Sequence, residues 1–129
     1  MELKHKDITD KILKGFYEVY NELGSGFLES VYEKALSIVL KNYELSVESQ
    51  KPINVYFRSN VVGEFRADIL VNGKIIVELK AVKAIIPEHE AQLINYLKAT
   101  DIEIGLLLNF GNQPEFKRIA YDNNRKNRR

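Results

Sequence analysis

Two acidic residues and one lysine interrupt a pair of strongly apolar segments near the middle of the chain. Asp68 lies in the first segment, and Glu78 and Lys80 lie in the second. Side chains alternate between the two faces of a β-strand, so Glu78 and Lys80 are expected to share a face. Carboxylates brought together on an apolar surface repel each other, and Mg²⁺ or Mn²⁺ would relieve the repulsion because these ions prefer oxygen ligands. The alternative is an ordinary salt bridge between Lys80 and an acid on a solvated sheet face.

The connection between the two segments decides whether Asp68 joins the other two residues. Strands are predicted over 62–71 and 74–82, with Asn72 and Gly73 between them. A two-residue turn would put the apolar side chains of the two strands on opposite faces, because a shift of one residue reverses every side chain. We therefore predict a three-residue loop with a bulge and with Gly73 in the left-handed conformation. Asp68 would then share the face of the other polar residues. The opposite face would hold four apolar side chains: Ala67, Ile69, Val77 and Leu79.

The elements that must position this hairpin follow from the periodicity of the apolar residues. Helical spacing predicts helices over 6–22 and 28–41, and Pro87 begins a third helix that extends to about residue 99. Four more segments are predicted to be strands: 45–49, 53–58, 103–109 and 116–121. The order is then α-α-β-β-β-β-α-β-β. One mixed β-sheet flanked by helices, an α/β fold, is the natural arrangement for that order.

The sequence resembles a nuclease superfamily in several places. Asp68 and the sequence E-L-K at 78–80 are similar to the D-x(n)-(D/E)-x-K motif of the PD-(D/E)xK nucleases. Gln92 and Tyr96 lie four residues apart on one face of a predicted helix. They resemble the Q-x-x-x-Y element of the recombination-exonuclease branch, and Glu29 resembles the helical acid of that branch.

A narrower resemblance concerns residues 26–32, whose sequence is G-F-L-E-S-V-Y. This segment is similar to the signature of the GxxExxY family, a group of small bacterial and archaeal proteins placed in the same superfamily. The similarity continues through 89–93 and 95–99. Residue 67 is alanine where the superfamily motif has proline, and no metal ligand is lost with that change. The resemblance implies a restriction-endonuclease-like core.

The resemblance also implies a divalent-metal site and a role for each of its residues. Four residues would hold Mg²⁺ or Mn²⁺: Glu29, Asp68, Glu78 and Leu79, the last through its backbone carbonyl. Lys80 would assist the attacking water, Gln92 would orient it, and the two strand acids would be catalytic residues as well as ligands. Tyr32 and Tyr96 would support the site.

Two other motifs have a structural role in this sequence. Residues 24–26, G-S-G, follow no strand and lead to no Gly-Lys-Ser/Thr sequence, so a phosphate-binding loop is rejected. They are expected to separate two helices and to let Glu29 and Tyr32 reach the sheet. Leu93 stands where a zinc-binding helix that begins at His89 would need a second histidine. His89 is therefore expected at the start of a helix.

Two functions of different classes fit this pattern. The first is a metal-dependent nuclease that hydrolyses phosphodiester bonds of nucleic acid, with DNA expected before RNA. The second is a non-catalytic nucleic-acid-binding or regulatory module that keeps the same fold. The small size of 129 residues and the net charge of +1 favour the module, whereas the intact E-x-K sequence favours the enzyme.

The composition limits the domain organisation. The length suits one domain over 1–124, followed by a tail over 125–129 in which four of the five residues are basic. The tail is either a solvated chain end or a phosphate-binding arm. The absence of cysteine excludes disulfides and thiolate metal sites. No apolar run is long enough to cross a bilayer. We expect a cytoplasmic protein with nucleic acid as its partner, and the oligomeric state stays open, a homodimer included.

Overall fold

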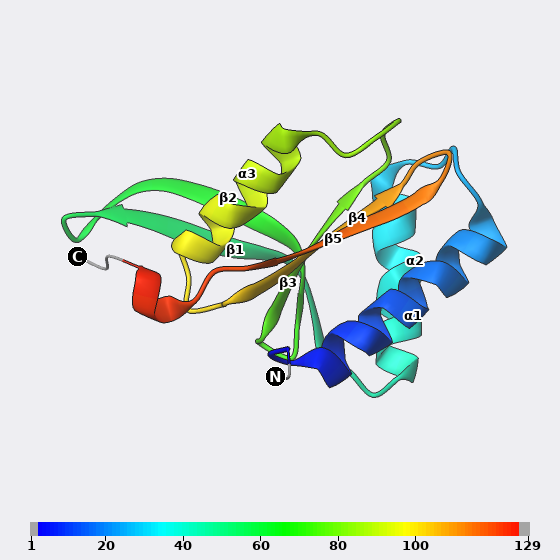
Figure 1. Cartoon of the computed structure of the whole chain (residues 1–129), viewed down its shortest axis with the longest axis horizontal. Coiled ribbons are helices and arrows are strands. Elements are labelled where there is room, and N and C mark those ends of the chain that lie inside the picture. The colour runs from blue at the N-terminus through cyan, green and yellow to red at the C-terminus, as the bar shows by residue number, and fades with distance from the viewer. Residues whose placement is uncertain (1–2, 127–129) are drawn as a thin grey trace.

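A five-stranded mixed sheet with helices on both faces forms the body of the protein (Figure 1). The structure is a computed structural model, which describes residues 3–126. Helices α1 (Lys6–Leu23) and α2 (Glu29–Asn42) pack on one face of the sheet, and α3 (Pro87–Lys98) packs on the other. The predicted fold class, an α/β restriction-endonuclease-like core, is confirmed.

The strands follow the order of the chain across the sheet. They are β1 (Val47–Phe57), β2 (Asn60–Val71), β3 (Ile75–Lys80), β4 (Ile104–Phe110) and β5 (Pro114–Ala120). Neighbouring strands are antiparallel except β3 and β4, which are parallel because α3 forms the crossover between them. A short 3-10 helix, η1 (Asn123–Arg125), follows β5.

The order of helices and strands follows the prediction, with one difference. The strands predicted over 45–49 and 53–58 are joined into the single strand β1, which passes through Pro52. A proline lacks the N–H that a central strand would need, but β1 lies at the edge of the sheet, where this loss is tolerated.

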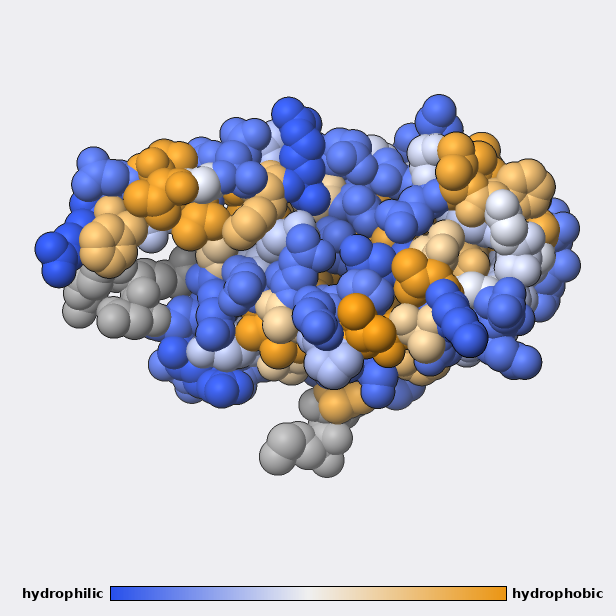
Figure 2. All heavy atoms as spheres, turned by 90° about the horizontal axis from the view of Figure 1, so that it is seen from above, coloured by the Kyte–Doolittle hydropathy of each residue, from blue (hydrophilic) through white to orange (hydrophobic). Residues whose placement is uncertain are grey.

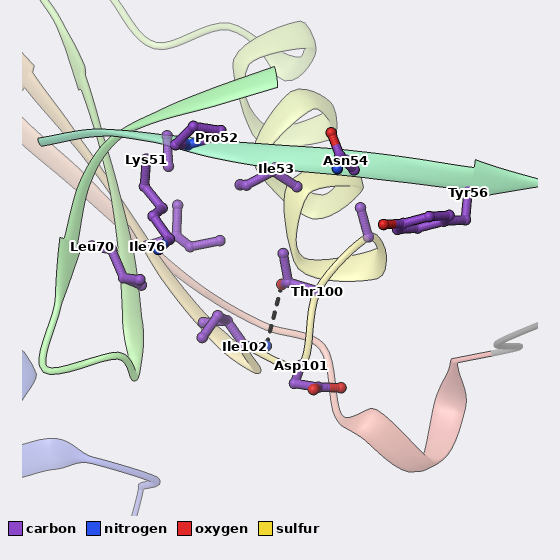
Figure 3. A pocket seen from close by; sticks show the side chains of 12 residues that line it. Lys51, Pro52, Ile53, Asn54, Tyr56, Leu70, Ile76, Thr100, Asp101 and Ile102 are labelled. Atoms are coloured by element: carbon purple, nitrogen blue, oxygen red, sulfur yellow. Dashed lines mark hydrogen bonds between the residues drawn. The ribbon is translucent and has the colours of Figure 1, made fainter. Parts of the chain in front are cut away.

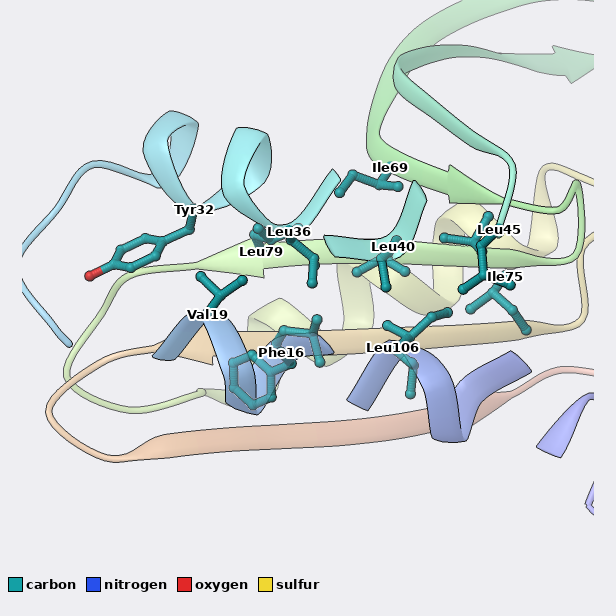
Figure 4. Packing of buried hydrophobic residues seen from close by; sticks show 14 of the residues in the cluster. Phe16, Val19, Tyr32, Leu36, Leu40, Leu45, Ile69, Ile75, Leu79 and Leu106 are labelled. Atoms are coloured by element: carbon teal, nitrogen blue, oxygen red, sulfur yellow. The ribbon is translucent and has the colours of Figure 1, made fainter. Parts of the chain in front are cut away.

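Apolar side chains fill a separate core on each face of the sheet. The larger core lies under α1 and α2. Ile12 and Phe16 recur at helical spacing on α1, as Leu36 and Leu40 do on α2, so each pair lies on the side of its helix that packs on the strands. Figure 4 shows Phe16, Leu36 and Leu40 in this core. The smaller core lies under α3 and includes Leu93 and other residues of that helix. Because both faces are covered, β3 and β4 are almost fully buried, and apart from Glu78, Lys80 and Asn109 their side chains are apolar.

The connection between β2 and β3 is the three-residue loop that the alternation of side chains predicts. Val71 pairs with Ile75, and the N–H of Lys74 donates to the carbonyl of Val71 at 2.9 Å. Asn72 and Gly73 both have positive φ angles, 53° and 63°, so Lys74 is the extra residue on the β3 side. The predicted register of the hairpin is therefore confirmed.

The prediction for the faces of β2 is wrong at Ala67. Ile69, Val77 and Leu79 pack in the core under α1 and α2, as expected, but Ala67 packs in the core under α3. At Asp68, the odd-numbered side chains of β2 therefore change from the core under α3 to the core under α1 and α2. The physical reason is that β2 leaves β3 at this point. The last β2–β3 pair is Ile69 with Val77, and an isolated two-stranded ribbon twists more strongly than a wide sheet.

We call residues 51–67 the wing, because here β1 and β2 pair only with each other. Figure 1 shows the wing extending away from the other three strands. Gln50 marks the same boundary on β1: its φ is 53°, and no pair forms between it and Asp68, although Ser49 and Lys51 on either side are paired. We call the place where β2 leaves β3, between Asp68 and Glu78, the fork.

Candidate active site at the fork

At the fork, the carboxylates of Asp68 and Glu78 each accept a hydrogen bond from the backbone of the opposite strand. The N–H of Asp68 donates to Oε1 of Glu78 at 3.0 Å, and the N–H of Leu79 donates to Oδ2 of Asp68 at 2.8 Å. These two side chains take the backbone donors that would otherwise lack partners where the β2–β3 ladder stops. The structure thus brings together the two strand acids that the sequence singled out.

Burial makes this pair electrostatically unusual. Glu78 is only 6% exposed. Burial raises the pKa of Glu78 to about 8, and the negative charge of Asp68 contributes, against the opposing effects of the Asp68 N–H and the Lys80 ammonium. A nearby divalent cation would favour the ionised form and reverse this shift. The pair is therefore unfavourable in its charged form until a positive charge is supplied.

Lys80 ends β3, one side-chain period beyond Glu78 and level with Asn109 on β4. It is partly exposed, and among residues 3–126 its ammonium has no ion-pair partner. The ordinary salt bridge considered as the alternative from the sequence does not form among these residues. The ammonium is free to contact a ligand at the fork.

Asn109 is a site residue that the sequence reasoning missed. It is fully buried, and its amide exchanges two hydrogen bonds of 3.0 Å with the backbone of Val82 and donates a third to Glu115. These bonds fix the chain immediately after Lys80. An asparagine at the end of the apolar run L-L-L was the only signal, and it indicates a buried amide without indicating its partner.

Replacing Gly111 with alanine should disturb this chain segment strongly. A Cβ atom at Gly111 would lie 2.2 Å from the carbonyl oxygen of Val82, so one backbone segment must shift. We expect the free energy of unfolding to fall by about 2 kcal/mol or more, as for other overpacked sites, measured by urea denaturation. Gly63→Ala is the matched control, since its nearest neighbour is 4.0 Å away. Similar losses in the two variants would contradict the close approach.

Tyr32 supports the start of α2. Its hydroxyl donates to the carbonyl of Gly24 at 2.6 Å and accepts from the N–H of Phe27 at 3.2 Å, and its ring stacks on Phe110 at 4.2 Å. The loop between α1 and α2 is thereby tied to the sheet.

Glu29, the first residue of α2, is exposed. Within residues 3–126, no three acidic, histidine or cysteine side chains are grouped to hold a metal ion, so Glu29 does not join Asp68 and Glu78.

Glu33 lies closer to the fork than the sequence reasoning foresaw. Gln50 donates from Nε2 to Oε1 of Glu33 at 2.8 Å. Burial raises the pKa of Glu33, the hydrogen bond from Gln50 opposes this shift, and the charge of Asp68 adds to it. Glu33 follows Glu29 by four residues and so shares its helical face, which is the signal that could have found it. Nothing in the sequence indicates the left-handed conformation of Gln50.

Helix α3 brings Tyr96 to the other side of the fork. The Tyr96 ring packs 4.7 Å from that of Phe65. Burial, with the added charges of Glu78 and Asp68, raises the pKa of Tyr96 to about 12, so its hydroxyl remains protonated and can donate a hydrogen bond. Gln92, one turn earlier, is exposed and lines a shallow pocket with Phe65 and Tyr96.

Two further expectations concern the ends of elements. His89 accepts a hydrogen bond at Nδ1 from the N–H of Ile86, which confirms its position at the start of α3.

In the C-terminal tail, the Arg125 guanidinium lies 4.4 Å from the centre of the Tyr121 ring. The Lys126 ammonium donates to two backbone carbonyls of the segment after α3. These two basic residues contact the body of the protein, and residues 127–129 lie outside the described part of the chain.

The fold and the fork define an α/β protein of the nuclease type, and the comparisons with known proteins agree. The sequence matches the family model of the PD-(D/E)XK nuclease superfamily over residues 6–119, and the chain belongs to this superfamily. Nucleases of this superfamily generally use divalent metals, and the superfamily implies a nucleic-acid substrate. Membership of the narrower GxxExxY family stays a prediction.

A solved structure shows the same fold. The crystal structure of a protein called SSO0001 superposes with a TM-score of 0.51 at 19% sequence identity, covering 94% of this chain and 71% of the other. No curated protein matches the sequence significantly. In the part of the chain that the structure describes, no helix is long and apolar enough to span a membrane.

Proposed function

We propose that the protein is a metal-dependent nuclease that hydrolyses phosphodiester bonds of DNA at the fork. The observation that carries the proposal is the meeting of Asp68 and Glu78, with Lys80 two residues after Glu78 on the same strand. The Lys80 ammonium has no ion-pair partner within residues 3–126. Two acids and a lysine at the point where two strands separate are unfavourable for stability, and they suit phosphodiester chemistry.

The donor set fits a hard divalent cation. Mg²⁺ is commonly held by one or two carboxylates and keeps several waters, so Asp68 and Glu78 suffice as its protein carboxylates. The carbonyl of Leu79 is proposed as a further ligand. Glu29, which the resemblance assigns as the helical acid, stands apart from Asp68 and Glu78 in the described residues and is not included in this ligand set. When bound, the ion supplies positive charge that stabilises the charge developing on the scissile phosphate.

The side chains around the fork can then divide the remaining work. Lys80 can hold the attacking water, relay its proton and offset the charge of the phosphate. Gln92 on α3 can orient the same water through its amide. Tyr96, which stays protonated, can donate a hydrogen bond to an anionic group at the fork. Tyr32 acts at a distance, because it holds the loop that leads into α2.

Addition of Mg²⁺ or Mn²⁺ should raise the melting temperature, because the ion binds only the folded protein. Asp68→Ala should abolish the increase, since it removes one of the two carboxylates. Differential scanning fluorimetry with increasing metal measures both. Glu64→Ala, which removes an exposed acid of the wing, is the control and should keep the full increase. An unchanged increase in Asp68→Ala would show that Asp68 is not a ligand.

A cleavage assay tests the function itself. Labelled single-stranded DNA, double-stranded DNA and RNA are incubated with Mg²⁺, Mn²⁺ or EDTA, with Lys80→Ala as the matched variant. Cleavage that needs metal and Lys80 supports the nuclease. The second candidate, a nucleic-acid-binding module, is favoured because in the described residues no third acid is grouped with Asp68 and Glu78 so as to hold a metal ion. Tight binding without cleavage under every condition would support that candidate.

A further inference from the structure

The wing carries hydrophobic side chains that remain largely exposed. Four residues near its tip share this property: Tyr56 (57% exposed), Phe57 (58%), Val61 (56%) and Val62 (62%). Figure 2 shows hydrophobic side chains gathered at the end of the molecule where the wing lies. Tyr56 pairs with Val61, so these two side chains share one face of the wing, and Phe57 lies on the other face. Exposed apolar side chains that gather at one end of a molecule indicate a binding site more often than single exposed residues do.

The turn at the tip adds a cation to this patch. Arg58 and Ser59 both have positive φ angles, 49° and 67°, where Asn-Gly is the easier choice for a two-residue hairpin turn. The guanidinium of Arg58 lies 5.0 Å from the centre of the Phe57 ring. An arginine beside an exposed aromatic ring offers a stacking surface and a positive charge together, which suits a nucleobase and its phosphate.

The charge and the position of the wing favour nucleic acid as the occupant of this patch. Residues 51–67 contain three basic side chains and one acidic side chain: Lys51, Arg58, Arg66 and Glu64. The wing also begins at the fork, so it offers a surface along which a strand whose phosphate lies beside Asp68 can pass. A protein partner would explain the apolar side chains but not this continuity with the candidate active site.

A hollow lies against one side of the wing (Figure 3). Tyr56 and Asn54 line it from β1, and residues 100–102 line it from the segment after α3. Its volume is about 340 Å³. Apolar side chains form its inner wall: Ile53, Leu70 and Ile76. A flat, largely apolar ring such as a nucleobase can lie against Tyr56 in this hollow.

We propose that the wing binds the unpaired bases of single-stranded nucleic acid, with Tyr56 and Phe57 stacking on them. This inference rests on the proposed function, because it takes the fork as the position of the scissile phosphate. The seven residue steps from Val61 to Asp68 span roughly 23 Å at about 3.3 Å per step. A stacked strand rises about 3.4 Å per nucleotide. The tip should therefore contact bases about seven nucleotides from the fork.

The test is a length series of fluorescein-labelled oligothymidylates from 4 to 16 nucleotides, measured by fluorescence anisotropy with Ca²⁺ in place of Mg²⁺, so that a cation occupies the fork, and with gel analysis to show that the strands remain intact. The wild-type Kd should fall in a step near seven nucleotides. Tyr56→Ala and Phe57→Ala should each weaken binding of the longest strand by roughly tenfold to a hundredfold, the range for loss of one stacked base. Tyr56→Phe should keep the fall in Kd near seven nucleotides, because the aromatic ring is retained.

The controls distinguish base stacking from general attraction of phosphate and from dimer formation. Ile38→Ala removes a side chain that is 63% exposed on α2 and should bind like the wild type. A blunt duplex should bind equally to the wild type and to Phe57→Ala, and all variants should keep the wild-type melting temperature. Unchanged affinity in both wing variants, or an equal loss for the duplex, would overturn the proposal. A wild-type dimer that becomes a monomer in Phe57→Ala would instead assign the patch to a second copy of the chain.

These outcomes are independent of the cleavage assay. A step in affinity without cleavage would retain the wing and reject the nuclease function. Cleavage without a step would retain the nuclease and reject the wing.

Discussion

Lys80→Ala should lower the rate of metal-dependent cleavage by about a hundredfold or more, because that is the usual contribution of a positioned acid–base group. The Lys80 ammonium carries no ligand atom for a cation, so metal binding should not weaken. It also lacks an ion-pair partner among residues 3–126, so its removal should cost little stability. The expected result is a loss confined to turnover.

Single-turnover cleavage and the metal-induced rise in melting temperature, measured on the same variants, separate these effects. Lys83→Ala is the matched control, since Lys83 is an exposed lysine of the segment that follows β3. It should cleave at nearly the wild-type rate. Glu78→Gln should lose both cleavage and the metal-induced rise, whereas Gln92→Ala should lose only part of the rate. Equal losses in Lys80→Ala and Lys83→Ala would assign Lys80 to general attraction of phosphate.

Without divalent metal, the free energy of unfolding should fall as the pH rises from about 5 to about 8. Glu78 has a pKa of about 8 in the folded protein, above the usual value of 4.5. Within this window the folded protein keeps a proton that the unfolded chain has lost, so raising the pH favours unfolding. Each pH unit in this window corresponds to about 1.4 kcal/mol, so the total loss is several kcal/mol at most.

Urea denaturation in EDTA across this pH range measures the effect, and Glu78→Gln should flatten it. The groups around Glu78 are Asp68 on β2, Lys80 on β3 and Tyr96 on α3, all of which remain in that variant. Glu88→Gln changes an exposed acid on α3 and should keep the wild-type slope. The same slope in Glu78→Gln and in the wild type would mean that another group causes the pH dependence.

The hairpin that carries the acids could be predicted from the sequence because its constraint is local. Alternating apolar residues on both strands allow only one parity of register, and Gly73 supplies the left-handed position that this register needs. The meeting of Asp68 and Glu78 follows from the same parity. These features depend on neighbours in the chain, which a sequence displays directly.

The features that could not be predicted depend on how the sheet twists and on which loops it meets. The exchange of faces at Asp68 comes from the separation of β2 from β3, and the alternation of residues is the same on either side of it. The hydrogen bond from Gln50 to Glu33 joins an edge strand to a helix. It depends on the left-handed backbone conformation of Gln50, which the residue type does not predict. Asn109 shows its burial in the sequence but not that its amide binds Val82.

The sheet has one further consequence, which concerns how the protein folds. Its strands lie in the order β1-β2-β3-β4-β5, so no strand has to insert between two that have already paired. The antiparallel pairs close through short turns, whereas β3 and β4 must wait for the whole α3 crossover, and loops of greater length cost more entropy to close. Asp68 and Glu78 belong to the early, local hairpin. Lys80 comes to lie beside Asn109 only when β3 pairs with β4, which is the later, long-range step. A folding intermediate that contains only β1, β2 and β3 would therefore hold the two acids near each other before Lys80 reaches its final surroundings.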